Sequence, residues 1–181
     1  MTTAPTNSTP GLPIVIRHMR AEDLEQVQAI DKVSFSMPWP ASAYRYELFE
    51  NLSSLLWVAE APEARIAGMI VIWMIMDEAH IATIAVHPNY RARGIAQRLL
   101  VSAMQEAIQK GAHSATLEVR ASNTIAHQLY RRFGFQIVGS RTHYYKDNNE
   151  DAIIMTVDGL DKEYLDWLIS GEWQSQSFNT V

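Results

Sequence analysis

Residues 91–96, Arg-Ala-Arg-Gly-Ile-Ala, are the stretch of this chain best suited to bind an anion. They follow an apolar, alternating segment, residues 81–86, and Pro88, which has no N–H to donate to a strand ladder. Residues with helical spacing come next, and a helix start carries unpaired N–H groups and a partial positive charge. Gly94 and Ala96 let a ligand approach the backbone closely. The turn is suited to hold phosphate oxygens, although a Gly near a helix start binds nothing in many α/β proteins.

The local charge supports an anionic ligand. Between Asn89 and Gly134 there are seven Lys or Arg residues against two Glu, a local balance of +5 in a chain of net charge −5. Nucleic-acid binding through these residues is a weak alternative, because the chain is acidic overall and the phosphates of one ligand account for them better. The basic residues are Arg91, Arg93, Arg98, Lys110, Arg120, Arg131 and Arg132.

An apolar stripe predicts the helix that starts at this turn, with Gly111 placed for a left-handed C-cap. The stripe consists of Ala96, Leu99, Leu100, Ala103, Met104, Ala107 and Ile108.

The remaining chain alternates strands and helices, which predicts an α/β fold with a mixed central sheet of about six to seven strands and about four helices. Two of the strands, on either side of Pro62, are expected to form an antiparallel hairpin. Strands are expected over residues 14–17, 55–60, 64–76, 79–86, 114–120, 135–138 and 151–157. Helices are expected over residues 21–33, 42–51 and 123–133 and along the apolar stripe, with Asn123 as an N-cap.

Length and composition suit one domain: 181 residues, 48% hydrophobic and 19% charged. We expect a flexible N-terminal arm over residues 1–13, a globular domain over residues 14–157 and an acidic, partly helical extension over residues 158–181. The extension has five acidic residues against Lys162 and so supplies −4 of the net charge.

Composition also excludes several classes of site. Without cysteine there are no disulfides, thiolate metal sites or cysteine acyl-enzyme, which is compatible with a reducing cytoplasm. The six histidines have none of the short spacings that metal sites use, so we expect no metal. The longest apolar run, residues 66–76, is too short to cross a membrane, which takes about 20 residues. The arm has the features of neither a signal peptide nor a transit peptide. We therefore expect a cytoplasmic protein without a membrane partner.

The turn resembles the signature of the GCN5-related N-acetyltransferases, Arg/Gln-x-x-Gly-x-Gly/Ala, which Arg91, Gly94 and Ala96 satisfy. The resemblance implies acetyl-CoA as a co-substrate, with its pyrophosphate on the amides of the turn. The pantetheine arm would then pair with the preceding strand.

Acetyl transfer from a thioester to an amine needs a neutral amine, a polarised carbonyl and a proton for the departing thiolate. Glu118, on the polar face of strand 114–120, could take a proton from the ammonium. Tyr130 could supply one, because a phenol of pKa ~10 protonates a thiolate of pKa ~8.5 at a cost of about two kcal/mol. From the residues alone, Glu118 is otherwise a solvated strand residue or a partner of Arg120, and Tyr130 a core aromatic with its hydroxyl in water.

The pKa of an acceptor amine sets the free-energy cost of bringing it to its neutral form. Neutralising an α-amine of pKa ~8 at pH 7 costs about 1.4 kcal/mol, against roughly 4.6 kcal/mol for a lysine of pKa ~10.4. One moderate base is enough for an N-terminus, so these costs permit an N-terminal acceptor.

A narrower resemblance covers about residues 14–157 and rests on residues 117–123, 129–135, 144–145 and 150–155. These look like the RimI branch of the family, which acetylates the N-terminal alanine of a small-subunit ribosomal protein. By that resemblance, Glu118 is the general base and Tyr130 the general acid. The implied acetyl-CoA site consists of Ile84, Ala85, Val86, Arg91, Ala92, Arg93, Gly94, Ile95, Ala96, Gln97 and Asn123. The implied peptide groove consists of Phe35, Pro38, Trp39, Tyr144 and Tyr145.

The chain departs from the family pattern at Ala96, which replaces a commoner glycine, and at His143, where an asparagine is frequent. The arm and the extension lie outside the pattern. The aromatics of residues 35–40 have a second interpretation, favoured by the residues alone, as a hydrophobic plug over the core.

Three functions stay open besides nucleic-acid binding. The first is direct transfer from acetyl-CoA to a ribosomal-protein N-terminus by a monomer, and the acidic balance suits a basic protein acceptor. The second keeps the fold and the cofactor but uses lysine side chains or a small amine as acceptor. The third is a non-catalytic acyl-CoA-binding module, which the presence of both Glu118 and Tyr130 disfavours.

Overall fold

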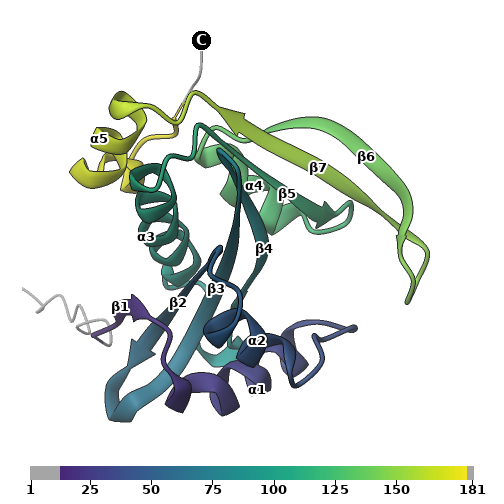
Figure 1. The fold of residues 1–181 in the computed structure, drawn as a ribbon. Helices are drawn as coiled ribbons and strands as arrows, with labels where there is room; N and C mark the ends of the chain where they lie inside the picture. Colours follow the sequence, from purple (N-terminus) through teal and green to yellow (C-terminus); the bar gives the residue numbers. More distant parts are fainter. Residues whose placement is uncertain (1–12, 179–181) are drawn as a thin grey trace, which may run out of the picture.

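The structure is a computed structural model that describes residues 13–178 (Figure 1). The described residues form seven strands and five α-helices, which confirms the predicted α/β class. The predicted arm lies outside these residues except for residue 13. The strands are β1 (Val15–His18), β2 (Ser54–Ala61), β3 (Arg65–Ile75), β4 (Glu78–Val86), β5 (Ser114–Arg120), β6 (Gln136–Tyr145) and β7 (Glu150–Asp158). The helices are α1 (Leu24–Ser34), α2 (Ala43–Phe49), α3 (Ile95–Gln109), α4 (Thr124–Arg132) and α5 (Lys162–Ser170), and η4 (Glu172–Gln174) is a 3₁₀ turn.

The strands form one mixed sheet in the order β1-β2-β3-β4-β5-β7-β6. The pair β4 and β5 is parallel, whereas the other neighbouring pairs are antiparallel, including the predicted hairpin of β2 and β3. Figure 1 shows β5, β7 and β6 running at an angle to β2, β3 and β4. The sheet therefore has two halves that meet at its one parallel pair.

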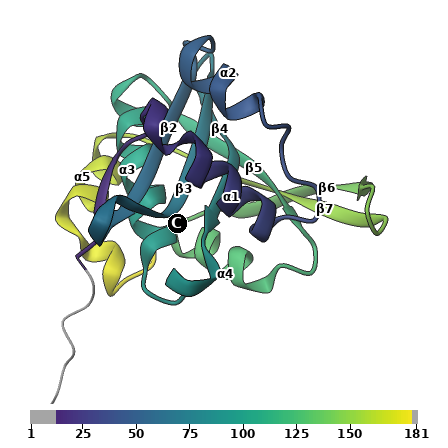
Figure 2. The same cartoon turned by 90° about the horizontal axis from the view of Figure 1, so that it is seen from below.

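The two faces of the sheet bury separate cores. Along β3, Ile70 and Ile72 belong to the core shared with α3, α4 and α5, whereas Met69 and Val71 belong to the core shared with α1 and α2. Since alternate strand residues point to opposite faces, these two groups of helices cover opposite faces (Figure 2).

Helix α3 forms as its sequence predicts. Most of its apolar stripe is fully buried, and Gly111 follows the helix with φ +99°. A positive φ lets the chain turn away directly after the helix, which glycine permits without a steric penalty.

Two local features differ from the expectations. β6 runs to Tyr145, well beyond the predicted residues 135–138, because β7 pairs with it along most of its length. Most of its residues are exposed on both faces, so the sequence has no alternation that would mark the strand. The helix predicted over residues 21–33 begins as a 3₁₀ turn, Ala21–Asp23, where the buried carboxylate of Asp23 binds Arg17 through two hydrogen bonds of 2.7 and 2.8 Å.

The predicted extension contains α5 as its helical part, while the domain boundaries stay predictions. No helix in residues 13–178 is long and apolar enough to span a membrane.

Gly68 in β3 should tolerate no side chain. A Cβ there would lie 2.8 Å from the carbonyl oxygen of Ala85 and 3.2 Å from Leu99 Cδ1. We expect Gly68→Ala to lower the free energy of unfolding by about 1–3 kcal/mol, measured by urea denaturation, because backbone must move.

Gly139→Ala is the matched control for this prediction. A Cβ at Gly139, in β6, would meet Ile154 Cδ1 at 3.7 Å, an ordinary contact. Equal losses of stability in the two variants would contradict the close approach of β3 and β4 at Gly68.

Candidate active site

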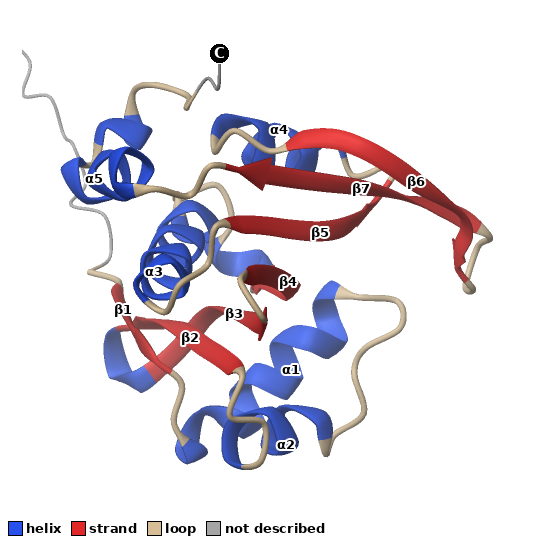
Figure 3. Ribbon diagram, turned by 45° about the horizontal axis from the view of Figure 1, so that its top comes forward, coloured by secondary structure: helices blue, strands red, loops and turns tan. Residues whose placement is uncertain are grey.

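β4 and β5 pair for only part of their length. Their parallel pairing covers the first four residues of each strand and ends at Ile81 and Leu117. Beyond it, β4 continues to Val86 alongside β3, and β5 continues to Arg120 alongside β7 (Figure 3). Glu118 is the first β5 residue past the parallel pairing. We call the region where the two strands part the opening.

The main chain of β4 faces this opening. The N–H of His87 donates to the main chain of β3 at 2.9 Å, so the main-chain groups of this residue point away from β5. Because alternate residues direct their N–H and C=O groups to opposite sides, Ile84 and Val86 direct theirs to the opening and Ala85 to β3. The Val86 carbonyl accepts a hydrogen bond from Arg91 Nε at 3.1 Å.

The turn before α3 leaves main-chain donors free. Ala92 and Gly94 both have positive φ, +58° and +72°, and Gly94 is the N-cap residue without a side chain to satisfy the first turn. The first helical hydrogen bond runs from Arg98 N to Gly94 O at 3.1 Å. The three N–H groups before it have no partner within the helix. They belong to Ile95, Ala96 and Gln97.

The basic residues of this region do not all serve one ligand. Arg98 donates to the main-chain carbonyl of residue 14 at 2.7 Å, and Arg120 binds two acidic side chains. Arg132 donates to the main-chain carbonyl of Trp173 at 2.8 Å. Arg91 and Arg93 remain at the turn. Fewer basic residues are therefore available to bind an anion at this turn than the local charge of +5 indicates.

Glu118 is held by two partners from other strands. Arg141 of β6 lies 3.0 Å from Oε1, and His80 of β4 lies 3.3 Å from Oε2. The Glu118 side chain is 13% exposed, so water still reaches it. The alternative pairing with Arg120 is wrong, because Arg120 binds Asp147 and Glu150 instead. Sequence reasoning missed His80 and Arg141, since their link to Glu118 exists only across the folded sheet.

Tyr130 of α4 is almost fully buried, at 4% exposure, and its ring packs against Phe135 at a centroid distance of 5.6 Å. Burial raises the pKa of Tyr130 well above its ordinary value, and Tyr145 adds to the shift. Within residues 13–178 its hydroxyl has no hydrogen-bond partner, and it is not sealed from solvent.

Tyr145 connects the surroundings of Tyr130 and Glu118. Burial raises the pKa of Tyr145 to about 12; nearby Arg120 opposes the shift, and Tyr144 and Glu118 increase it. The guanidinium of Arg120 lies 3.9 Å from the centre of the Tyr145 ring. The structure thus gathers Glu118, Tyr130 and Tyr145 in one region. Tyr144 is more exposed, with Arg141 5.6 Å from its ring centre.

The predicted loop residues divide between the core and the surface, while their role in a peptide groove stays a prediction. Trp39 packs on the core beneath α1 and α2, and its ring stacks on Trp73 at 6.0 Å. Trp73 stacks in turn on His80 at 5.6 Å, so a row of rings leads from the loop to Glu118. Phe35 and Pro38 lie on the exposed part of the loop.

Arg120 ties this loop to the turn between β6 and β7. It donates to Ser36 Oγ at 3.1 Å and to Asp147 at 2.8 Å, and Ser36 also hydrogen-bonds to Asp147. The loop and the turn therefore meet two residues beyond Glu118 in β5.

Asn123 caps α4 as predicted. Its Oδ1 accepts a hydrogen bond from Ala126 N at 3.1 Å, which fixes the start of the helix that carries Tyr130. The amide group of its side chain remains available to a ligand.

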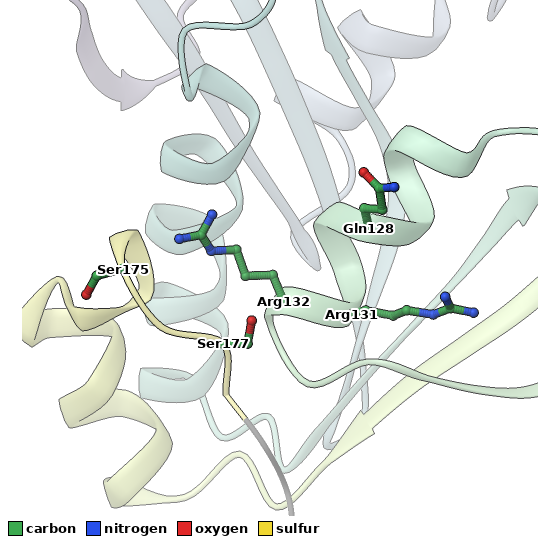
Figure 4. A pocket seen from close by; sticks show the side chains of 5 residues that line it. All are labelled: Gln128, Arg131, Arg132, Ser175 and Ser177. Carbon is green, nitrogen blue, oxygen red and sulfur yellow. The ribbon is translucent and has the colours of Figure 1, made fainter.

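A separate open pocket of about 600 Å³ lies between α4 and the residues that follow η4 (Figure 4). None of the predicted site residues lines it. Its lining consists of Gln128, Arg131, Arg132, Ser175 and Ser177. Within residues 13–178, no three His, Asp or Glu side chains cluster in a way that could hold a metal ion.

Known proteins are similar to this chain in sequence and in fold. A Bacillus subtilis (strain 168) protein that carries a provisional name as a ribosomal protein bS18-alanine N-acetyltransferase is 42% identical over 142 residues, 78% of this chain and 93% of that protein. The enzyme of that name from Escherichia coli (strain K12) is 30% identical over 144 residues, 78% of this chain and 95% of that protein.

Solved structures agree with these sequence matches. The crystal structure of the Escherichia coli ribosomal-protein-S18-alanine N-acetyltransferase matches with a TM-score of 0.74 and 29% identity, over 81% of this chain and 94% of that chain. Arabidopsis thaliana NAA60, solved in complex with acetyl-CoA, shares the fold with a TM-score of 0.72 and 20% identity, over 81% of this chain and 98% of that chain.

The model of one protein family, described as the acetyltransferase (GNAT) family, matches residues 24–135. This range contains β2, β3, β4 and β5, the turn before α3 and both Glu118 and Tyr130. Since the match covers more than half of the chain and the curated relatives are covered over nearly their whole length, the chain belongs to the acetyltransferase (GNAT) family.

Proposed function

We propose that this chain transfers the acetyl group of acetyl-CoA to the N-terminal alanine of a small-subunit ribosomal protein. The observation that carries the proposal is the position of Glu118, a partly exposed carboxylate where β4 and β5 part, held by Arg141 and His80. The names of the Bacillus subtilis and Escherichia coli relatives support the choice of acceptor.

The opening suits acetyl-CoA as a substrate. The main-chain groups of Ile84 and Val86 can pair with the amides of its pantetheine arm. The free N–H groups at the start of α3, together with Arg91 and Arg93, can bind its pyrophosphate, because a helix N-terminus favours negative charge.

Glu118 accepts the proton that the acceptor ammonium must lose before attack. A carboxylate has about four lone-pair sites, and each Glu118 oxygen has one contact within ion-pair distance, Oε1 with Arg141 and Oε2 with His80. The carboxylate is thereby oriented while retaining sites for the amine or a bridging water. The neutral amine then attacks the thioester carbonyl, and the carbon–sulfur bond breaks as the new carbon–nitrogen bond forms. The attacking nitrogen loses a second proton as the amide forms, and this proton replaces the one that Tyr130 gives to sulfur.

Tyr130 stabilises the departing thiolate. Its raised pKa keeps the phenol protonated at neutral pH, so the hydroxyl can donate to sulfur and then pass its proton. Each unit by which the phenol pKa rises adds about 1.4 kcal/mol to the free energy of complete proton transfer to the thiolate. The phenol therefore first donates a hydrogen bond to sulfur and transfers its proton afterwards. A hydroxyl without a partner within residues 13–178 also fits the alternative of a core aromatic with its hydroxyl in water, and the Tyr130→Phe variant described below separates the two roles.

The turn glycine gives a test of the acetyl-CoA site. Gly94→Ala places a side chain at φ +72°, which costs about 1–2 kcal/mol and moves the first N–H groups of α3. We expect a several-fold increase in the Kd for acetyl-CoA, measured by isothermal titration calorimetry.

Gly111→Ala is the control for that test. Gly111 has φ +99° at the far end of the same helix, and a Cβ at this position would have no atom within 4 Å. The variant should lose comparable stability in thermal melts but keep the affinity of the unaltered chain. Equal weakening of binding in both variants would place the ligand elsewhere.

The acceptor is tested by thiol release from acetyl-CoA with two peptides. One begins with a free alanine in a ribosomal-protein-like sequence, and the other has the same sequence, a blocked N-terminus and one lysine. We expect turnover of the free N-terminus only, and a loss of about 100-fold or more in rate for Glu118→Gln, because general base catalysis contributes about that much.

Glu25→Gln, at an exposed position of α1, serves as the control and should keep full activity. Preference for the lysine peptide would contradict the acceptor but leave the fold and the cofactor intact. No turnover of either peptide despite tight acetyl-CoA binding would favour the small-amine or binding-module alternatives.

A further inference from the structure

The end of α4 is capped by the C-terminal segment, which we define as residues 161–178. A helix end leaves its last carbonyl groups without helical partners. Here the hydroxyl of Tyr164 donates to the Phe133 carbonyl at 2.9 Å, and the N–H of Phe178 donates to the Arg132 carbonyl at 2.9 Å. Two of the carbonyls at this helix end are therefore satisfied by residues far along the chain.

Arg132 also binds the same segment through its side chain. Its Nε donates to the Trp173 carbonyl at 2.8 Å, and its Nη2 donates to the Gln174 carbonyl. Figure 4 shows Arg132 reaching from α4 towards the segment that carries Ser175, whereas Arg131 points the other way. Main chain and side chain of one residue thus hold the segment at two places.

Aromatic packing completes the contact. The ring centre of Phe133 lies 5.7 Å from that of Trp167 and 6.0 Å from that of Trp173. The Tyr164 side chain beside them is fully buried. Gly134 adopts φ +83°, which glycine reaches without a steric penalty, and it turns the chain beside Phe178. The contact is made by buried and partly buried rings, which hold the helix end in place.

Tyr130 belongs to this same helix end. Its carbonyl accepts hydrogen bonds from Phe133 N at 2.9 Å and Phe135 N at 3.1 Å, and its ring packs on Phe135. The residues that the C-terminal segment holds are therefore those that terminate the helix around Tyr130. The matched family segment ends at residue 135 and does not include the C-terminal segment.

We propose that the C-terminal segment is a positioning element for Tyr130, with Tyr164 and Arg132 as its positioning residues. The segment hydrogen-bonds to the last carbonyls of α4 and to the Arg132 side chain, and so fixes where the phenol hydroxyl lies relative to the leaving sulfur. This inference rests on the proposed role of Tyr130 as proton donor. It makes the rate of transfer depend on residues that touch neither substrate.

The test is a double-mutant cycle of Tyr164→Phe and Tyr130→Phe in the full chain. Tyr164→Phe removes only the capping hydroxyl and keeps the buried ring. We expect it to lower kcat about threefold to tenfold, because small displacements of a reacting group are costly, with the KM for acetyl-CoA unchanged. In the Tyr130→Phe background it should lower kcat no further.

Two further variants complete the design. Arg132→Gln removes the second grip and should show the same dependence on Tyr130, with Arg132→Lys recovering part of kcat. Tyr46→Phe removes a hydroxyl from an exposed tyrosine of α2 and should leave kcat unchanged in both backgrounds. Thermal melts confirm that each variant is folded.

The outcomes separate this inference from the proposed function. If Tyr164→Phe slows both backgrounds equally, or only raises the KM, the segment contributes stability alone and the positioning role is wrong. If Tyr130→Phe by itself keeps full kcat, Tyr130 is not the proton donor and the positioning role is overturned with it. Acetylation of lysine rather than of the N-terminus would change the acceptor and leave this inference standing.

Discussion

The site depends on one constraint, the loss of pairing between β4 and β5 after four residues. Main-chain N–H and C=O groups inside a protein need partners, and a strand that leaves its neighbour has an unpaired edge. Here β3 holds one edge of β4 and β7 holds one edge of β5, so both strands remain extended while they part. The result is a rigid opening lined by main-chain groups, next to the N-terminus of α3.

The proposed chemistry lies where elements from both halves of the sheet meet at this opening. Glu118 comes from β5, and its partners His80 and Arg141 come from β4 and β6. An ionised carboxylate away from bulk water needs such partners, and they fix its orientation. Tyr130 enters from α4 with its hydroxyl free. Four elements thus position the proposed proton acceptor and the proposed proton donor, and no single segment of sequence contains the arrangement.

The sequence predicts local structure well and long-range contacts poorly. The apolar stripe of α3, the Asn123 cap and the two faces of β5 follow from periodicity and capping, which are local. The partners of Glu118 do not, because Arg141 lies on an edge strand whose exposed faces give no alternation. Local charge likewise overstated the anion site, since Arg98 and Arg120 bind other parts of the chain. The cofactor residues, the groove residues and the cytoplasmic, monomeric state stay predictions.

Residue-resolved amide hydrogen exchange, with and without acetyl-CoA, tests the central claim most directly. The account predicts slower exchange at Ile84 or Val86 in β4 and at Ile95, Ala96 and Gln97 at the start of α3. Amides of α5 should be unaffected, because the C-terminal segment touches neither substrate. Protection confined to the pocket beside Gln128 and Arg131, with no change at the opening, would contradict the account.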